Sequence, residues 1–256
     1  MEQSCLNNSN NLKDFLEFKY WQYNSPDFIK MDPVSIPHLF KKKEDIEIAA
    51  YLAATIAWGQ RKTIIRNALS LMAMMDNAPH DFVLNANDAD FKKFLGFVHR
   101  TFNGSDCIYF LNALQNIYVK HGGLEKCFEE KDVKEGILKF RKIFFELPHL
   151  PRTQKHLANP AAGASAKRIN MFLRWMIRDD GAGIDFGIWR IFTPSQLYCP
   201  LDIHSGNAAR KLGLLKRKQN DWKAVEELTR NLRNFDAEDP VKYDIALFAL
   251  GVEEKC

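Results

Sequence analysis

The sequence has few cysteines, and none of them forms a paired motif. Its five cysteines are widely spaced, odd in number and never arranged as Cys-x-x-Cys. This pattern argues against a disulfide framework, a zinc ribbon and a four-cysteine iron–sulfur cluster. We therefore expect reduced thiols, no bound metal and no other cofactor.

Long apolar runs and nucleotide-binding glycine motifs are also absent from the sequence. The most apolar run, Ile46–Trp58, contains Glu47 and is too short to span a bilayer. The amino terminus is polar and asparagine-rich, without the apolar stretch of a secretory signal. The sequence contains no P-loop, dinucleotide-binding or Gly-x-Ser-x-Gly motif. We expect a monomeric cytoplasmic protein that does not contact membranes.

The composition is that of an ordinary globular chain. Of the 256 residues, 46% are hydrophobic and 27% are charged, values that exclude a disordered or collagen-like protein. The length predicts one or two lobes. Lysines and arginines number 36 and acidic residues 32, which gives a net charge of +4. This charge permits a polyanionic partner without requiring one.

Hydrophobic periodicity predicts an all-α protein with two helical lobes. Nearly every periodic stretch has the spacing of a helix, and no run alternates as a strand does. A central lobe is assigned to 40–198 and a second lobe to 1–39 plus 199–256, with a cleft between them. The role of 1–40 is left open. We expect about ten helices, at 43–57, 64–75, 88–97, 106–121, 134–146, 165–178, 185–192, 202–212, 221–235 and 240–250.

The predicted helix 165–178 combines a buried stripe with three cations. Its apolar stripe follows the i, i+3, i+4, i+7 pattern of a helix that packs along one face. Arg174 and Arg178 follow Lys167 by 7 and 11 positions, so each falls within about 20° of Lys167, opposite that stripe. We expect one exposed basic face, either simply solvated or used to bind phosphates.

Asp202 stands at the start of the next informative helix, in the segment Pro-Leu-Asp-Ile-His. An aspartate in this position is first of all an N-cap, which stabilises a helix by about 1 kcal/mol. A carboxylate aimed into a cleft from a helix start can also stabilise a developing cation or accept a proton. The two roles do not exclude each other.

Taken in order along the chain, several segments resemble the helix-hairpin-helix DNA glycosylase superfamily. Thr55–Gln60 resembles its leucine-rich helix ending in glutamine, and Pro200–Leu214 resembles its Val-Asp-Thr-His segment and the helix that follows. The stretch Lys167–Met176 is similar to the helix that carries the attacking lysine in bifunctional members. Tyr243–Gly251 matches the final helix. The stretch Phe97–Phe102 and the helix containing Lys167 also resemble a largely uncharacterised bacterial family.

The sequence departs from the superfamily pattern in its hairpin. The usual Leu-Pro-Gly-Val-Gly is replaced by Asn159–Gly163, and the lysine follows two positions late. The separation between Lys167 and Asp202 is 202 − 167 = 35 positions, which is similar to the archaeal branch that excises oxidised guanine. Because Cys256 stands alone after the last helix, the cluster-free branches are the better comparison.

The resemblance implies a DNA-repair glycosylase with abasic-site lyase activity, acting on duplex DNA with a damaged base, such as an oxidised purine. Lys167 would attack C1′ of the sugar, and Asp202 would stabilise the sugar cation. The cleft between the lobes would hold both residues. The extruded base would enter a pocket, for which the candidates are Trp58, Gln60, His99 and Phe102. Three of them also have a structural interpretation: Trp58 as a core residue, Gln60 as a cap, and His99 as a surface or hydrogen-bonded histidine.

Two basic segments converging on one cleft are what phosphate binding requires. The candidates for contacts with the DNA backbone are Arg168, Arg174, Arg178, His204, Arg210, Lys211, Lys216, Arg217 and Lys218. The alternative function is a non-catalytic nucleic-acid-binding or structural protein on the same scaffold. Asp179, Asp180 and Asp185 could in principle ligate a hard cation, but they lack the spacing of a known calcium site.

Overall fold

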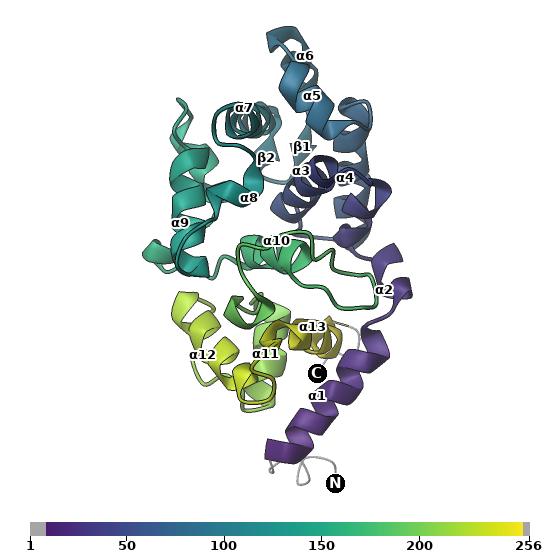
Figure 1. Cartoon of the computed structure of the whole chain (residues 1–256), viewed down its shortest axis with the longest axis vertical. Helices are drawn as coiled ribbons and strands as arrows, with labels where there is room; N and C mark the ends of the chain where they lie inside the picture. The colour runs from purple at the N-terminus through teal and green to yellow at the C-terminus, as the bar shows by residue number, and fades with distance from the viewer. Residues whose placement is uncertain (1–8, 253–256) are drawn as a thin grey trace. The chain divides into compact units, whose positions relative to one another are not determined.

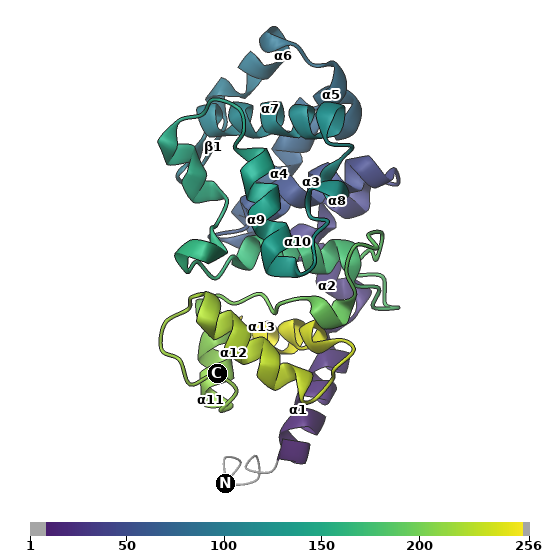
Figure 2. The same cartoon turned by 60° about the vertical axis from the view of Figure 1, so that its left-hand side comes forward.

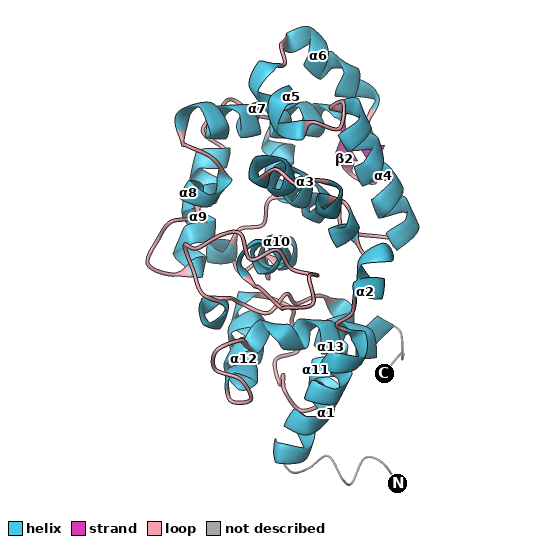
Figure 3. Ribbon diagram, turned by 45° about the vertical axis from the view of Figure 1, so that its right-hand side comes forward, coloured by secondary structure: helices cyan, strands magenta, loops and turns pink. Residues whose placement is uncertain are grey.

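The computed structural model describes residues 9–252, and most of them are helical (Figure 3). Within this range there are thirteen α-helices and one two-stranded antiparallel sheet. The all-α prediction is therefore confirmed. No described helix is long and apolar enough to cross a membrane.

Contacts divide the chain into two compact units. Unit 1 combines the described residues up to Phe28 with those from Pro160 onwards, and unit 2 is Ile29–Asn159. These limits differ from the predicted lobes, because 160–198 belongs with Asp202 and 29–39 belongs to the other unit. The physical reason lies in the helix carrying Lys167, whose buried arginines pair with acids near the carboxyl terminus.

Unit 2 is built on an aromatic core between α3, α7 and α9 (Figure 1). Tyr51 of α3 packs on Phe110 of α7, and Phe110 lies 4.7 Å, centroid to centroid, from Phe144 of α9. All three rings are buried. The elements of unit 2 are α3 (Lys43–Thr55), α4 (Arg61–Met74), α5 (Pro79–Asn85), α6 (Asp88–Lys92), β1 (Val98–His99), β2 (Phe102–Asn103), α7 (Gly104–Lys120), α8 (Leu124–Cys127) and α9 (Val133–Phe144).

Unit 1 brings together both ends of the described chain. Its α13 packs against α1 and α11 (Figure 1, Figure 2). At the crossing with α11, a Cβ on Gly251 would lie 2.6 Å from the carbonyl oxygen of His204, so a larger residue would push the helices apart. The helices of unit 1 are α1 (Ser9–Tyr23), α10 (Lys167–Ile177), α11 (Ile203–Lys211), α12 (Trp222–Arg233) and α13 (Tyr243–Val252), while α2 (Pro26–Lys30) spans the boundary.

Several predicted elements were wrong. The segment 185–192 is not helical: the backbone N–H groups of Phe186 and Trp189 donate to carbonyl oxygens of α10 instead. The predicted helix 88–97 ends at Lys92 and continues as a 3-10 turn. Helices α1, α2, α5 and α8 and the short sheet were not predicted, because each is short or only weakly periodic.

Candidate active site

Lys167 is the first residue of α10. The residue before it, Ala166, adopts a left-handed conformation with φ 51° and ψ 33°. This conformation costs an L-residue roughly 1–2 kcal/mol. The carbonyl oxygen of Ala166 nevertheless accepts from the N–H of Asn170, and the Asn170 side chain donates to the Ser165 carbonyl. The chain thus turns sharply into α10 and fixes the start of the lysine side chain.

Asp202 is the N-cap of α11. Its Oδ1 atom accepts from the backbone N–H groups of His204 at 2.9 Å and Ser205 at 3.0 Å. Ser205 returns the interaction, since its hydroxyl accepts from the Asp202 N–H at 3.0 Å and completes a capping box. The predicted capping role is therefore present in the structure, and it uses only one carboxylate oxygen.

The second oxygen of Asp202 faces Lys167. Nζ of Lys167 lies 3.7 Å from Oδ2 of Asp202, and the two side chains are 24% and 29% exposed. Both residues belong to unit 1, so this distance is set within one compact body. The arrangement places an amine and a carboxylate side by side, with each group accessible to solvent.

A chain of hydrogen bonds fixes the backbone of Asp202. The Asn220 side-chain amide donates to the Asp202 carbonyl at 2.9 Å, and Arg210 donates to the Asn220 Oδ1 at 2.6 Å. Arg210 also donates to the carbonyl of Arg217 at 2.9 Å. The loop between α11 and α12 is thereby tied to the backbone of the candidate site.

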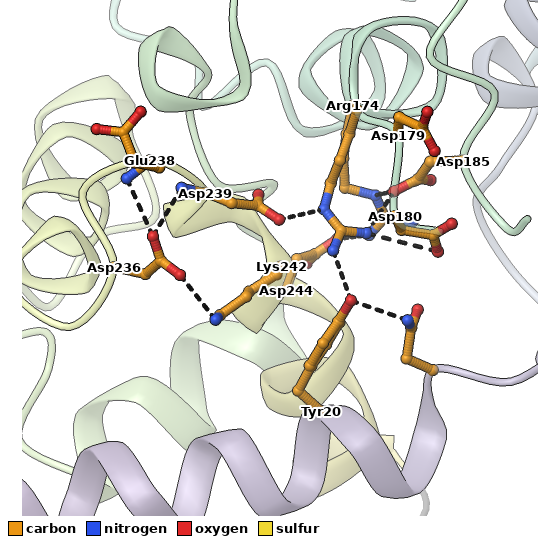
Figure 4. Close-up of polar contacts among 12 residues, drawn as sticks. Tyr20, Arg174, Asp179, Asp180, Asp185, Asp236, Glu238, Asp239, Lys242 and Asp244 are labelled. Carbon is orange, nitrogen blue, oxygen red and sulfur yellow. Dashed lines mark hydrogen bonds and ion pairs between the residues drawn. The ribbon is translucent and has the colours of Figure 1, made fainter. Parts of the chain in front are cut away.

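Arg174 and Arg178 do not share an exposed face with Lys167, so that prediction was wrong. Their side chains are 4% and 2% exposed. Arg174 forms ion pairs with Asp185 and Asp244. Arg178 pairs with Asp185 at 3.0 Å and with Asp180 at 3.6 Å. It also donates to Asp239 and to the Tyr20 hydroxyl, each at 2.7 Å, and Figure 4 labels these four partners. These arginines hold unit 1 together and are not available to DNA phosphates.

The sequence did contain a sign of this burial. Met171 and Trp175 lie on the side of α10 that carries the cations, and both are buried. A helix that is apolar on all sides is normally buried all round. The arginines on such a helix need acidic partners, and Asp185, Asp239 and Asp244 supply them. Asp239 and Asp244 were missed because they are distant in sequence.

Asp244 is an acid of the site region that the sequence analysis missed. It lies in the first turn of α13 and is buried. Burial raises the pKa of its carboxyl to about 6, against the lowering effect of Arg174 and Lys167. The nearby charges of Asp202 and Asp185 raise it further. Asp244 therefore gains its proton at a much higher pH than an ordinary aspartate.

The other predicted DNA-contacting residues have varied environments. His204, Lys211, Lys216 and Lys218 are exposed, and Arg168 is half-buried. Arg210 donates to Asn220 and to the Arg217 carbonyl, as described above. Arg217 pairs with Asp221, to whose Oδ1 it donates at 2.6 Å. Contact between the four exposed residues and the DNA backbone stays a prediction.

The predicted base-pocket residues lie in unit 2, whereas Lys167 and Asp202 lie in unit 1. His99 is 1% exposed and is held by Asn67 and by the Trp58 carbonyl. Phe102 is fully buried and packs on Phe110. The hydrogen bonds of His99 agree with its structural interpretation, and Phe102 is a core residue. Trp58 is half-buried, Gln60 is exposed without a capping hydrogen bond, and the pocket stays a prediction.

A buried aspartate in unit 2 was also missed. Asp106 accepts from the Thr153 hydroxyl at 2.8 Å, from Arg152 at 2.6 Å and from His156 at 3.1 Å. Burial acts to raise the pKa of Asp106, but these partners and the backbone N–H of Asn103 outweigh it and lower the pKa. The Asn-x-x-Asp spacing of a capping box was the available sequence signal.

The hairpin-like segment is a 3-10 turn at Pro160–Ala162, and the element before it is another 3-10 helix, Pro151–His156. Gly163 closes the turn with φ 86°, and its carbonyl accepts from the N–H of Trp222 at 2.9 Å. This turn therefore leads directly into α10 while anchoring the start of α12.

The acidic loop after α10 is occupied by interactions within the protein. Oδ1 of Asp180 accepts from three successive backbone N–H groups, and Asp185 binds both buried arginines. Among the described residues, no group of three His, Cys, Asp or Glu side chains is arranged to hold a metal. Cys199 is buried, and burial raises the pKa of its thiol well above the usual range.

These features define an all-α protein with a lysine–aspartate pair built on the starts of two helices. A sequence profile described as "Protein of unknown function (DUF2400)" matches residues 32–253, so the chain belongs to this family. Neither a curated protein nor a solved structure matches the chain.

Proposed function

We propose that this protein is a DNA-repair glycosylase with abasic-site lyase activity, built on a helix-hairpin-helix glycosylase-like scaffold. Lys167 is the nucleophile and Asp202 the carboxylate that assists it. The observation that carries the proposal is the 3.7 Å separation of Lys167 Nζ and Asp202 Oδ2, both partly exposed. We choose this reaction because the surrounding segments resemble the helix-hairpin-helix DNA glycosylase superfamily.

The role of Asp202 follows from charge. As the bond between base and sugar breaks, electrons leave with the base and positive charge develops on the sugar. A fixed carboxylate oxygen beside the sugar stabilises that charge. Because Oδ1 is held by the α11 cap, Oδ2 is already oriented and needs no reorganisation.

The role of Lys167 is nucleophilic. Its ammonium first loses a proton to solvent water, so Asp202 stays ionised. The free amine then forms a bond to C1′ as the bond between C1′ and the base breaks, and the base leaves with that bonding pair. At an abasic site the amine adds to the aldehyde and water leaves, giving an imine. Loss of a proton from C2′ then expels the 3′ phosphate by β-elimination, which cleaves the strand.

A purely structural ion pair is a poorer account of this pair. Exposed ion pairs contribute only about 0–1 kcal/mol. The α11 cap needs only one carboxylate oxygen, and Lys167 sits in the first turn of α10, where the helix dipole disfavours a cation. A lysine in that place is more readily explained by chemistry than by stability.

Base release from a panel of duplexes tests the proposal. Duplexes with an oxidised purine, an alkylated purine, uracil or no lesion are incubated with wild type, Lys167→Gln and Asp202→Asn. We expect release and strand cleavage for at least one lesion, no cleavage by Lys167→Gln, and release by Asp202→Asn slower by about 10²–10³-fold. Equal rates in all three proteins would contradict the proposal.

The 3-10 element before the hairpin-like turn favours a second candidate, a non-catalytic nucleic-acid-binding protein. A hairpin between two α-helices is the hallmark of the superfamily, and this chain has only the second helix. Salt-dependent binding of duplex with no base release and no cleavage of any substrate would identify this candidate.

A further inference from the structure

The loop after α11 and the exposed face of α12 form an open hollow that is mainly basic. We call it the α12 hollow. It is lined by Lys216, Arg217, Lys218, Gln219, Lys223, Glu226, Glu227 and Arg230. Five of these side chains carry positive charge and two carry negative charge. Lys223 and Arg230 were not among the residues predicted from the sequence to contact DNA.

The helix period explains why these residues share one face. Lys223 and Arg230 are seven positions apart, with Glu226 and Glu227 between them, which is the i, i+3, i+4, i+7 pattern of a single helical face. The opposite face, containing Val225 and Leu228, is buried in unit 1. Burial of that face therefore turns the charged stripe outwards.

The acids of the α12 hollow are engaged within the protein. Glu227 accepts from the backbone N–H of Lys216 at 2.7 Å, and Glu226 accepts from the Trp222 indole at 2.6 Å. Asp221, at the start of α12, pairs with Arg217 and leaves that guanidinium partly neutralised.

Four cations remain for a ligand. Lys216, Lys218, Lys223 and Arg230 are exposed, and none of them forms an ion pair with any residue in the range 9–252. They surround one hollow from two elements. Because five cations line the hollow against two acids, its net charge is positive, and this attracts a polyanion and raises its local concentration.

The hollow is also connected to the Lys167–Asp202 site. Asn220, which follows the basic loop, donates to the Asp202 carbonyl, and Arg210 bridges Asn220 and the Arg217 carbonyl. These bonds fix the backbone of the loop relative to Asp202. The hollow and the candidate active site therefore share one hydrogen-bonded loop within unit 1.

We infer that the α12 hollow binds the backbone phosphates of duplex DNA, independently of sequence. No aromatic ring lines it, so it offers no platform on which an unpaired base could stack. Lysine ammoniums suit phosphates as point charges, and such contacts position DNA without reading its bases. The choice of DNA over another polyanion rests on the proposed function.

Binding of undamaged duplex DNA at several salt concentrations tests this inference. The variant carries Lys216→Gln, Lys218→Gln, Lys223→Gln and Arg230→Gln. A matched control carries Lys41→Gln, Lys92→Gln, Lys131→Gln and Lys155→Gln, four exposed lysines of unit 2 with the same loss of charge. Fluorescence anisotropy gives the affinity, and thermal melting checks that both variants fold.

The expected result is a change in the salt dependence of binding. Each phosphate contact contributes about 0.9 to the slope of log affinity against log salt, so the variant loses up to about 3.6. The control loses less than about 1. Equal losses in variant and control, or an unchanged slope in the variant, would overturn the inference. So would unchanged duplex binding combined with lost binding of polyglutamate, since that pattern indicates an acidic protein partner.

This experiment separates the inference from the proposed chemistry. It uses undamaged DNA and requires no reaction at Lys167. A hollow-dependent slope in a protein that releases no base would uphold the inference and refute the glycosylase. Base release by wild type, together with the same salt dependence of binding in wild type and the hollow variant, would uphold the glycosylase and refute the inference.

Discussion

The Nζ atom of Lys167 lies 3.7 Å from Oδ2 of Asp202, the carboxylate oxygen that the α11 cap does not use. The two residues are 35 positions apart in sequence, yet they meet because α10 and α11 both start at the same place in unit 1. One oxygen of Asp202 therefore caps α11 while the other faces Lys167, so the capping role and the proposed chemistry can be tested separately.

Substitution of Asp202 separates capping from chemistry. Asn caps a helix about as well as Asp, whereas Ala costs about 1 kcal/mol. We expect Asp202→Asn to keep the free energy of unfolding within about 0.5 kcal/mol of wild type, and Asp202→Ala to lower it by about 1 kcal/mol. Urea denaturation measures both values.

Base release should not follow stability in these two variants. Both lack the carboxylate charge, so both should lose activity to a similar extent. If Asp202→Asn retained full activity, the carboxylate would be a cap alone.

Arg178 should be important for stability and not for DNA binding. It is buried among Asp180, Asp185 and Asp239. Arg178→Met removes the arginine that pairs with Asp180 and Asp239 and leaves Asp185 with Arg174 alone. Breaking a buried pair costs about 3–5 kcal/mol. Chemical denaturation measures the loss, and Lys218→Gln, an exposed cation, is the control with little change. A variant as stable as wild type would contradict this role.

Asp244 should make the stability of the protein depend on pH. Its pKa is raised by burial from 3.8 to about 6, so folding takes up a proton between these values. Its contribution to the free energy of unfolding is therefore full below pH 3.8 and is lost as the pH rises through about 6.

The measurement compares wild type with Asp244→Asn between pH 4 and pH 7. Asparagine does not titrate, so the stability of wild type relative to the variant should fall by about 2 kcal/mol over this range. A difference that stays constant with pH would show that Asp244 is ionised throughout.

Asp106 should hold unit 2 together. Replacement by Ala removes the acceptor for Thr153, Arg152 and His156. Thr153 and His156 are buried, and buried donors left without partners cost about 1–3 kcal/mol each, so we expect a loss of at least about 2 kcal/mol. Asp132→Ala, which removes an exposed cap of α9, is the control and should cost about 1 kcal/mol. Equal losses in the two variants would contradict the role of the Asp106 network.

The sequence predicted the helical class because apolar spacing is a local pattern. The pairing of Lys167 with Asp202 was predicted from the resemblance of the segments that contain them to known glycosylases. Apolar spacing identified α3, α4, α7, α9 and α10, and a proline–leucine–aspartate start identified the cap of α11. Long-range pairing was not accessible in the same way. The surroundings of Arg174 depend on Asp244, 70 positions away, and no helical wheel contains that information.

The division into units was missed for the same reason. Helix α10 belongs to the same unit as the residues that follow it. The ion pairs of its arginines and the hydrogen bonds from Phe186 and Trp189 hold it there. The acidic loop Asp179–Asp185 looked like a turn followed by a helix. Its buried Asp185 instead keeps the chain extended along α10.

The most direct test of the central claim is borohydride trapping on a duplex with a preformed abasic site. This substrate needs no base recognition, so only the amine chemistry is measured. Borohydride reduces the imine to a stable amine, and mass spectrometry of the digested adduct identifies the lysine. We predict an adduct on Lys167 that is lost in Lys167→Gln and kept in Lys155→Gln. No adduct in wild type, or one that survives in Lys167→Gln, would contradict the account.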